Sequence, residues 1–188
     1  HTAGHYLSAL SNMIASGEDT PDAQLRQRLD YMVDELQTCQ KAFGGGYVGG
    51  VPGSRALWTA IAGGDIQAIN RKWVPWYNVH KTLAGLRDAY LEVGNRQARD
   101  VLVQLGDWCV NLTAQLSDEQ MQQMLNQEHG GMNEVLADIY AITGDQKYLK
   151  TAERFDHHAI LVPLIHQEDQ LTGKHANTQI PKVVGLER

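Results

Sequence analysis

The sequence lacks the patterns that mark several common functions. Its two cysteines, Cys39 and Cys109, lie far apart and match neither a disulfide framework nor a zinc-ligand spacing, so we expect ordinary buried thiols. Lysine and arginine total 16 against 22 acidic residues, and this net charge of −6 gives no basic footprint for nucleic acid. No apolar run is long enough to span a membrane. Neither nucleic acid nor a membrane is therefore an expected partner.

Runs of alternating β-branched residues are also absent, and helical periodicity takes their place. Apolar residues recur at spacings of three and four, the pattern of helices with one buried face. The pattern predicts helices over residues 5–16, 56–62, 73–94, 96–116, 133–142 and 146–155. A further helix begins at Pro21, with Thr20 as N-cap, and ends before Gly44, and another begins after 116 with a capping box of Ser117 and Gln120. A last helix begins near Thr178, and residues 157–174 are expected to be irregular. We expect one all-α domain over residues 1–188.

An internal repeat indicates how these helices pair. The segment LRDAYLEVGN (86–95) matches LADIYAITGD (136–145) at an offset of 50 residues, and in both a helix ends at glycine before a short turn. SALSNMIASGED (8–19) is a weaker third copy, with Gly17 in the position of Gly94. A repeated αα-hairpin is a stacking unit, which forms either an open solenoid or a closed toroid.

The stretch WVPWYNVHKTLAGL (73–86) concentrates aromatic and polar side chains at the start of a predicted helix. Aromatic faces beside asparagine and histidine donors suit a sugar ring, which has apolar C–H faces and a rim of hydroxyls. The alternative is that Trp73, Trp76 and Tyr77 form a helix–helix core cluster. The glycine-rich segment GGGYVGGVPGS (44–54) is either a loop close to a ligand or a surface connection, and it lacks the lysine of a phosphate loop.

Eight histidines are present, and several precede or begin helices. His5, His80 and His175 lie beside glycine, asparagine or lysine at such positions, and His129 is a fourth candidate. A toroid would bring the corresponding ends of successive hairpins to one central cavity, where these imidazoles would meet. A structural role for each histidine, or a zinc site made of histidines alone, are the alternatives, and 157–158 reads as a pair in a loop.

Three acidic residues are candidates for chemistry, because glycosidases use carboxyl groups that flank the bond to be cut. They are Glu128, Glu134 and Asp138, of which the last two are four residues apart on one helix face. For Asp138 we favour a structural role, such as a hydrogen bond to a neighbouring helix, because Asp88 occupies the same position in the other repeat.

Four strings carry a family resemblance. GHYLSAL, PWYNVHKTLAGLRDAY, EHGGMNEVLADIYAITGDQKYL and HANTQIPKVVG resemble, in this order, the bacterial β-L-arabinofuranosidases of glycoside hydrolase family 127. The resemblance implies an (α/α)6 toroid, of which residues 1–188 form an internal fragment of the catalytic domain, truncated at both ends. It implies a retaining hydrolase that releases β-linked L-arabinofuranose from arabinose-containing glycans. The expected partners are an arabinose-containing oligosaccharide and the remainder of the same domain.

The resemblance also implies a zinc-bound cysteine thiolate as nucleophile and a glutamate as acid/base, both expected beyond residue 188. We therefore assign neither role to Cys39, Cys109 or Glu134, and we expect no zinc ligand and no hydrolysis from these residues alone. The resemblance places His5, His80 and His175 in motifs that contact arabinose, with Trp76, Tyr77 and Gln179 as weaker candidates for substrate binding.

Two other functions are compatible with the sequence. One is a different (α/α)6 carbohydrate enzyme, of the unsaturated-uronide hydrolase or sugar epimerase type, which would need a catalytic carboxylate or histidine pair within these residues. The other is a non-catalytic helical-repeat scaffold that binds a protein. A sugar that binds the native state would raise the stability of the protein in the enzyme cases and leave that of a scaffold unchanged.

Overall fold

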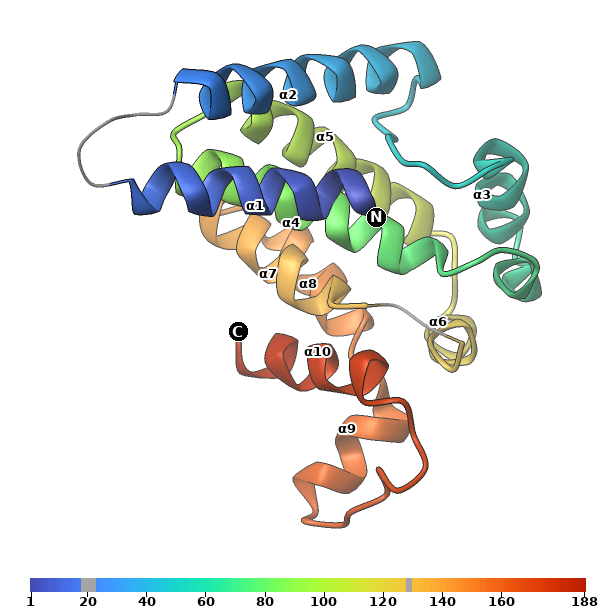
Figure 1. Cartoon of the computed structure of the whole chain (residues 1–188). Coiled ribbons are helices and arrows are strands. Elements are labelled where there is room, and N and C mark those ends of the chain that lie inside the picture. Colours follow the sequence, from blue (N-terminus) through green and yellow to red (C-terminus); the bar gives the residue numbers. More distant parts are fainter. Residues whose placement is uncertain (18–22, 128–129) are drawn as a thin grey trace. The chain divides into compact units, whose positions relative to one another are not determined.

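The computed structural model describes residues 1–17, 23–127 and 130–188, and these residues form helices joined by short connections (Figure 1). The helices are α1 (Thr2–Ser16), α2 (Ala23–Phe43), α3 (Ser54–Ala62), the 3-10 helix η1 (Ile66–Arg71), α4 (Pro75–Leu91), α5 (Arg96–Thr113), α6 (Asp118–Leu125), α7 (Met132–Thr143), α8 (Gln146–Arg154), α9 (His158–Ile165) and α10 (Ala176–Glu187). No strand occurs in these ranges, and the predicted all-α class with helical hairpins, as in part of an (α/α)6 toroid, is confirmed. Thr20, Pro21, Glu128 and His129 lie outside the described residues.

The chain divides into two compact units, which are described separately. The first unit comprises His1–Gly50 and Lys81–Cys109, and the second comprises Val51–His80 and Val110–Arg188. The divisions fall inside α4 and α5, so each of these two helices contributes residues to both units. None of the helices in the described ranges has the length and apolar character needed to cross a membrane.

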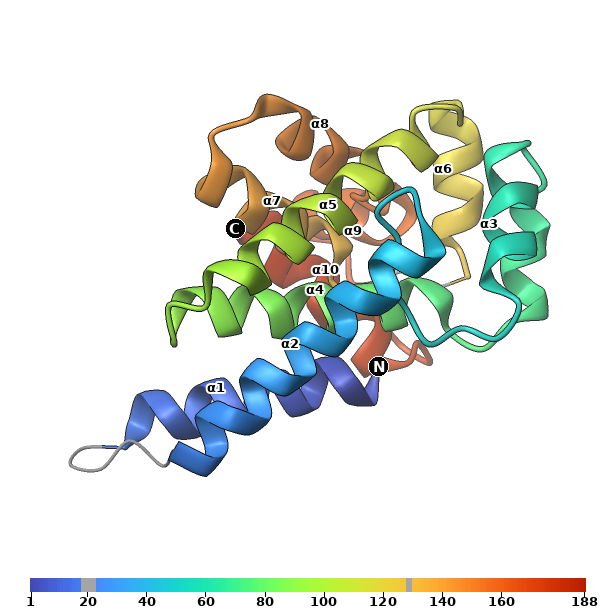
Figure 2. The same cartoon turned by 90° about the horizontal axis from the view of Figure 1, so that it is seen from above.

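In the first unit, α1 and α2 lie side by side as a hairpin (Figures 1 and 2). Their apolar faces are buried through Leu7, Leu10, Leu29 and Val33, which recur at the spacing that the sequence pattern indicated. Polar contacts attach the start of α5 to α2, because Asn95 donates to Asp30 and Gln97 donates to Asp34, each at 2.8 Å. The core of this unit therefore includes the apolar faces of α1 and α2, together with buried residues of α4 and α5 such as Leu86 and Leu102.

Two glycines allow α1 to approach the second half of α4 very closely within the first unit. A methyl group at Gly4 would lie 1.8 Å from the carbonyl oxygen of Lys81, and one at Gly85 would lie 2.5 Å from the carbonyl oxygen of Gly4. These contacts are between backbones, so no side-chain movement can relieve them. The glycine of GHYLSAL and that of the TLAGL string are thus required by the packing of the two helices.

The glycine-rich segment is fixed by its neighbours in the first unit. Tyr47 is buried, and its ring lies 4.7 Å from the ring of Trp108, measured between centroids. Gln40 donates from Nε2 to the carbonyl oxygens of Gly46, at 2.7 Å, and Val101, at 3.0 Å. The sequence left open whether this segment is a loop close to a ligand or a flexible surface connection. Residues 46 and 47 are held by buried contacts, so they do not form a flexible surface connection.

In the second unit, α7 and α8 form a hairpin, and α10 packs against α7. The side chain of Trp76 is fully buried in this unit, with ring centroids 4.9 Å from Trp58 and 5.0 Å from Phe155. Its indole N–H donates to the sulfur of Met124 at 3.3 Å. Trp76 therefore lies in the core, as in the alternative that the sequence left open.

The predicted repeat is present as two turns of the same geometry. Gly94 and Gly144 follow α4 and α7 with φ of 79° and 75°, a left-handed conformation that glycine adopts without a steric penalty. Asn95 and Asp145 then cap the next helices, since their side-chain oxygens accept from backbone N–H groups at 2.8 and 3.1 Å. The third copy differs, because Gly17 is extended, with φ of −75° and ψ of 110°.

The repeated aspartates both bind a neighbouring helix, as expected. In the first unit Asp88 accepts a hydrogen bond from the hydroxyl of Ser8 on α1. In the second unit the buried Asp138 accepts from the guanidinium of Arg188 at the end of α10. The structural role that was favoured for Asp138 is therefore confirmed.

One prediction about secondary structure is wrong. Residues 157–174 were expected to be irregular, but residues 158–165 form α9. The segment HAILVPLI misleads because Pro163 lies inside it and lacks the N–H that a helix interior uses. Burial of Ile160 and Leu161 in the second unit stabilises this short helix in spite of the proline. The capping box of Ser117 and Gln120 is confirmed at the start of α6.

Candidate functional site

His80 on α4 is the best-defined candidate in the second unit. Its side chain is buried, and Nε2 lies 3.7 Å from Oε2 of Glu134, in the first turn of α7. Two glycines before α7 leave room for the imidazole: a methyl group would lie 3.1 Å from Nδ1 if placed at Gly130 and 2.8 Å from Nε2 if placed at Gly131. The EHGGMNE string thus supplies both the space for the ring and the carboxylate that faces it.

Glu134 and Asp138 do not point into one cavity, although they are four residues apart on α7. Glu134 faces His80 and keeps about a quarter of its side chain exposed, at 24 %. Asp138 is buried and binds Arg188. Of these two carboxylates, Glu134 is the one that a ligand can reach.

The other two histidines occupy helix starts, as expected. His175 is exposed and caps α10, with its Nδ1 accepting from the backbone N–H of Asn177 at 3.2 Å. His5, in the first unit, is exposed on α1, and its ring meets that of His1 edge to face, with centroids 5.9 Å apart. Burial lowers the pKa of His5, and the positive charges of Lys81 and of the N-terminal amine act in the same direction.

The weaker candidates have three different environments. Trp76 is in the core of the second unit, whereas Tyr77, the next residue on α4, is half-buried. Gln179 on α10 is half-buried, and within the described part of the chain its Oε1 is buried without a hydrogen-bond partner. Buried polar atoms are nearly always satisfied, so this oxygen is suited to accept from a ligand hydroxyl or from water. A role in substrate binding for these residues stays a prediction.

A buried polar network, which the sequence pattern did not predict, attaches α10 to the rest of the second unit. Nζ of the buried Lys182 lies 2.8 Å from Nδ1 of His157, and Nε2 of His157 lies 3.0 Å from Oδ1 of Asn126. A lysine ammonium only donates, so His157 is the neutral tautomer with its proton on Nε2. Nearby, Nδ2 of Asn133 donates to Asp156 and to the carbonyl oxygen of Lys182, each at 3.0 Å. His157, expected in a loop, is therefore a buried residue that precedes α9.

This network predicts a loss of stability in mild acid. Burial lowers the pKa of His157 from 6.5 to about 4, and the positive charge of Lys182 adds to the effect. The unfolded chain then binds the proton more readily than the folded chain does. The contribution of His157 to the free energy of unfolding is therefore fully present above pH 6.5. About 3 kcal/mol of this contribution is lost as the pH falls towards 4.

Denaturant unfolding of the protein and of His157→Gln at several pH values measures this term. Glutamine can accept from Lys182 and donate to Asn126 without titrating. The raised pKa of Asp156, caused mainly by burial, has the opposite sign but is present in both proteins. Equal pH slopes for the two proteins between pH 6.5 and 4 would contradict the role assigned to His157.

The two cysteines do not form a reactive or metal-binding pair. Burial raises the pKa of Cys109, so that its thiol stays protonated at neutral pH. Cys39 is exposed on α2, so the expected burial is confirmed for Cys109 and wrong for Cys39. Among the residues that the structure describes, no group of three or more histidine, cysteine or acidic side chains is arranged to hold a metal ion. The described residues therefore do not fit the zinc site that the resemblance implies.

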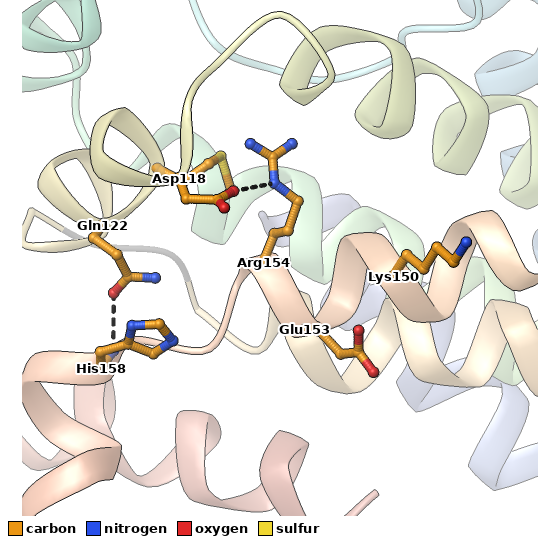
Figure 3. A pocket seen from close by; sticks show the side chains of 7 residues that line it. Asp118, Gln122, Lys150, Glu153, Arg154 and His158 are labelled. Atoms are coloured by element: carbon orange, nitrogen blue, oxygen red, sulfur yellow. Dashed lines mark hydrogen bonds and ion pairs between the residues drawn. The ribbon is translucent and has the colours of Figure 1, made fainter.

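A separate cavity of about 180 Å³ lies between α6, α8 and the start of α9 (Figure 3). It is lined by Asp118, Met121, Gln122, Lys150, Glu153, Arg154 and His158. Figure 3 shows that Arg154 binds Asp118, and its guanidinium also donates to the carbonyl oxygens of Thr113 and Leu116, at 2.7 and 2.6 Å. Gln122 in turn accepts from the backbone N–H of His158. These side chains hold helices together, which leaves them little capacity for a ligand.

Comparison with known proteins identifies the family. A search of curated proteins gave no match. The model of the family described as "Beta-L-arabinofuranosidase, GH127 catalytic domain" matches residues 1–188, the whole chain. This match agrees with the all-α hairpins and with the four strings in the sequence. The chain therefore belongs to the catalytic-domain family of the β-L-arabinofuranosidases, glycoside hydrolase family 127.

Proposed function

We propose that this chain supplies sugar-binding groups of a retaining hydrolase that releases β-linked L-arabinofuranose from arabinose-containing glycans. The observation that carries the proposal is the buried His80 facing the partly exposed Glu134 beside Gly130 and Gly131. The 3.7 Å between Nε2 and Oε2 is longer than a direct hydrogen bond, and a hydroxyl in contact with both atoms would link them. A carboxylate accepts from sugar hydroxyls, and an imidazole either donates or accepts.

Two residues of the HANTQIPK string, at the start of α10 and within it, support the same proposal. Gln179 has a buried acceptor oxygen with no partner among the described residues, and His175 presents its imidazole to solvent. These groups offer hydrogen bonds at several positions of a small polyol, and His5, in the GHYLSAL string of the first unit, is proposed as a substrate contact on the strength of its string alone. Few, well-placed polar groups are typical of sites that bind small ligands.

We expect these 188 residues by themselves to bind but not to hydrolyse the sugar. Cys109 is a buried, protonated thiol, and the described residues provide no cluster for zinc. A thiolate nucleophile needs both deprotonation and access. Turnover of a β-L-arabinofuranoside by the purified chain would contradict this part of the proposal.

Two exposed histidines allow a matched test of sugar binding. His175 belongs to the proposed site, whereas His166, at the end of α9, is exposed and lies outside every matching string. We expect His175→Asn to weaken the binding of methyl β-L-arabinofuranoside about tenfold, a loss of roughly 1.4 kcal/mol, because one hydrogen bond to the sugar is removed. Asparagine retains the cap of α10, so the fold is preserved.

Isothermal titration calorimetry of the unmodified protein, His175→Asn and His166→Asn measures the effect. His166→Asn should bind as the unmodified protein does. Equal affinities for all three proteins would remove His175 from the site. If the sugar neither binds nor raises the unfolding temperature of the unmodified protein, the carbohydrate function itself fails, and a scaffold that binds protein becomes the better explanation.

A further inference from the structure

Trp73 lies just before α4, the helix that carries His80, and its side chain is 72 % exposed. Within the same unit, Trp58 and Trp76 are buried. A single exposed apolar side chain needs no explanation by itself. Here, however, the backbone next to the indole has an unusual conformation.

The residue after Trp73 has a strained conformation. Val74 has φ of 40°, a left-handed value that is rare for a branched side chain because Cβ approaches the backbone too closely. Glycine at this position would remove the strain. Backbone strain of this kind persists only when the surroundings impose it, and it is concentrated at sites that bind ligands.

Asn78 imposes the strained turn. Its Nδ2 donates to the carbonyl oxygen of Val74 at 2.8 Å and to that of Trp73 at 3.4 Å, and its backbone N–H also donates to Val74 at 3.1 Å. Asn78 is buried in the second unit, so its amide is fixed in position. A buried side chain thus holds the turn in the conformation that presents the indole to solvent.

We infer that Trp73 is a stacking surface for the sugar unit next to the terminal arabinofuranose, an inference that rests on the function proposed above. A helix rises about 1.5 Å per residue, so Pro75 and His80 are about 8 Å apart along α4, a separation comparable with the length of one or two sugar rings. The C–H face of a sugar packs on an indole while the hydroxyls stay hydrated. The indole would therefore favour an oligosaccharide over a single arabinose.

The test compares two ligands, methyl β-L-arabinofuranoside and a β-L-arabinofuranosyl disaccharide. We expect Trp73→Ala to weaken disaccharide binding about tenfold, to leave binding of the methyl glycoside unchanged, and to leave the unfolding temperature unchanged. Trp73→Tyr should restore most of the disaccharide affinity, because a flat aromatic face remains. Tyr31→Ala, at an aromatic residue of α2 that is 61 % exposed, is the matched control and should bind both ligands normally. Asn78→Asp, which removes the donor, should reduce disaccharide affinity in the same direction.

Several results would overturn the inference. Trp73→Ala that binds both ligands as the unmodified protein does would remove the indole from the site. If Trp73→Ala weakens the binding of both ligands equally, the indole contacts the arabinose itself. If Trp73→Ala markedly destabilises the protein, Trp73 is a packing residue. If the unmodified protein binds neither ligand, the proposed function fails first. If it binds the methyl glycoside alone, only the inference about Trp73 fails.

Discussion

Gly4→Ala should destabilise the first unit by about 3 kcal/mol or more, because the added methyl group meets backbone at 1.8 Å. Alanine is the better helix former by about 1 kcal/mol, but this gain is too small to offset a clash between two helix backbones. In a protein of this size the expected decrease in unfolding temperature is roughly 6–12 °C. Hydrogen exchange should show that amides of α1 and of the second half of α4 lose protection first.

Gly50→Ala is the matched control in the same unit. A methyl group at Gly50 has no neighbour within 4 Å, and this glycine is not among those with positive φ. Its replacement should leave the unfolding temperature within a few degrees of the original value. If Gly4→Ala and Gly50→Ala have the same stability, the close approach of α1 to Lys81 is not present in solution.

Trp76→Ala should lower the free energy of unfolding of the second unit by about 3–5 kcal/mol, the usual cost of removing a buried aromatic side chain. The indole contacts Trp58 and Phe155 and donates to Met124. Its loss therefore leaves a large cavity and removes the hydrogen-bond donor of the Met124 sulfur. Urea unfolding, followed by the fluorescence of the remaining tryptophans, measures the change.

The same experiment separates a core residue from a pocket wall. Trp76→Phe keeps an aromatic ring and should recover a large part of the stability. Trp73→Ala, at an exposed position of the same stretch, should change stability by no more than about 0.5 kcal/mol. A stable Trp76→Ala variant with weakened sugar binding would instead make Trp76 a ligand contact.

Local signals in the sequence predicted most of the fold. The turns after Gly94 and Gly144 and the capping box at Ser117 each depend on residues within a few positions, so periodicity and capping rules were sufficient. The helix α9 was missed because Pro163 argues against a helix locally, while the burial of Ile160 and Leu161 that favours it depends on distant parts of the chain.

The candidate site was predictable in part. The motifs identified His80 and His175, but nothing in their spacing showed that Glu134 faces His80 while Asp138 turns to α10. Two residues four apart on a helix share a face only approximately, and their partners decide where each carboxylate lies. The burial of Lys182 was equally hard to predict, because a lysine is expected to be exposed unless tertiary contacts enclose it.

The two repeat aspartates occupy the same position of an αα-hairpin but bind different partners. Asp88 is held by a hydroxyl from a helix that precedes its hairpin, and Asp138 by a guanidinium from a helix that follows. The same position of the repeat thus binds a neighbouring helix in both units, while the partner group and its place in the chain differ. One aspartate position can therefore join an αα-hairpin either to a helix that comes before it or to a helix that comes after it.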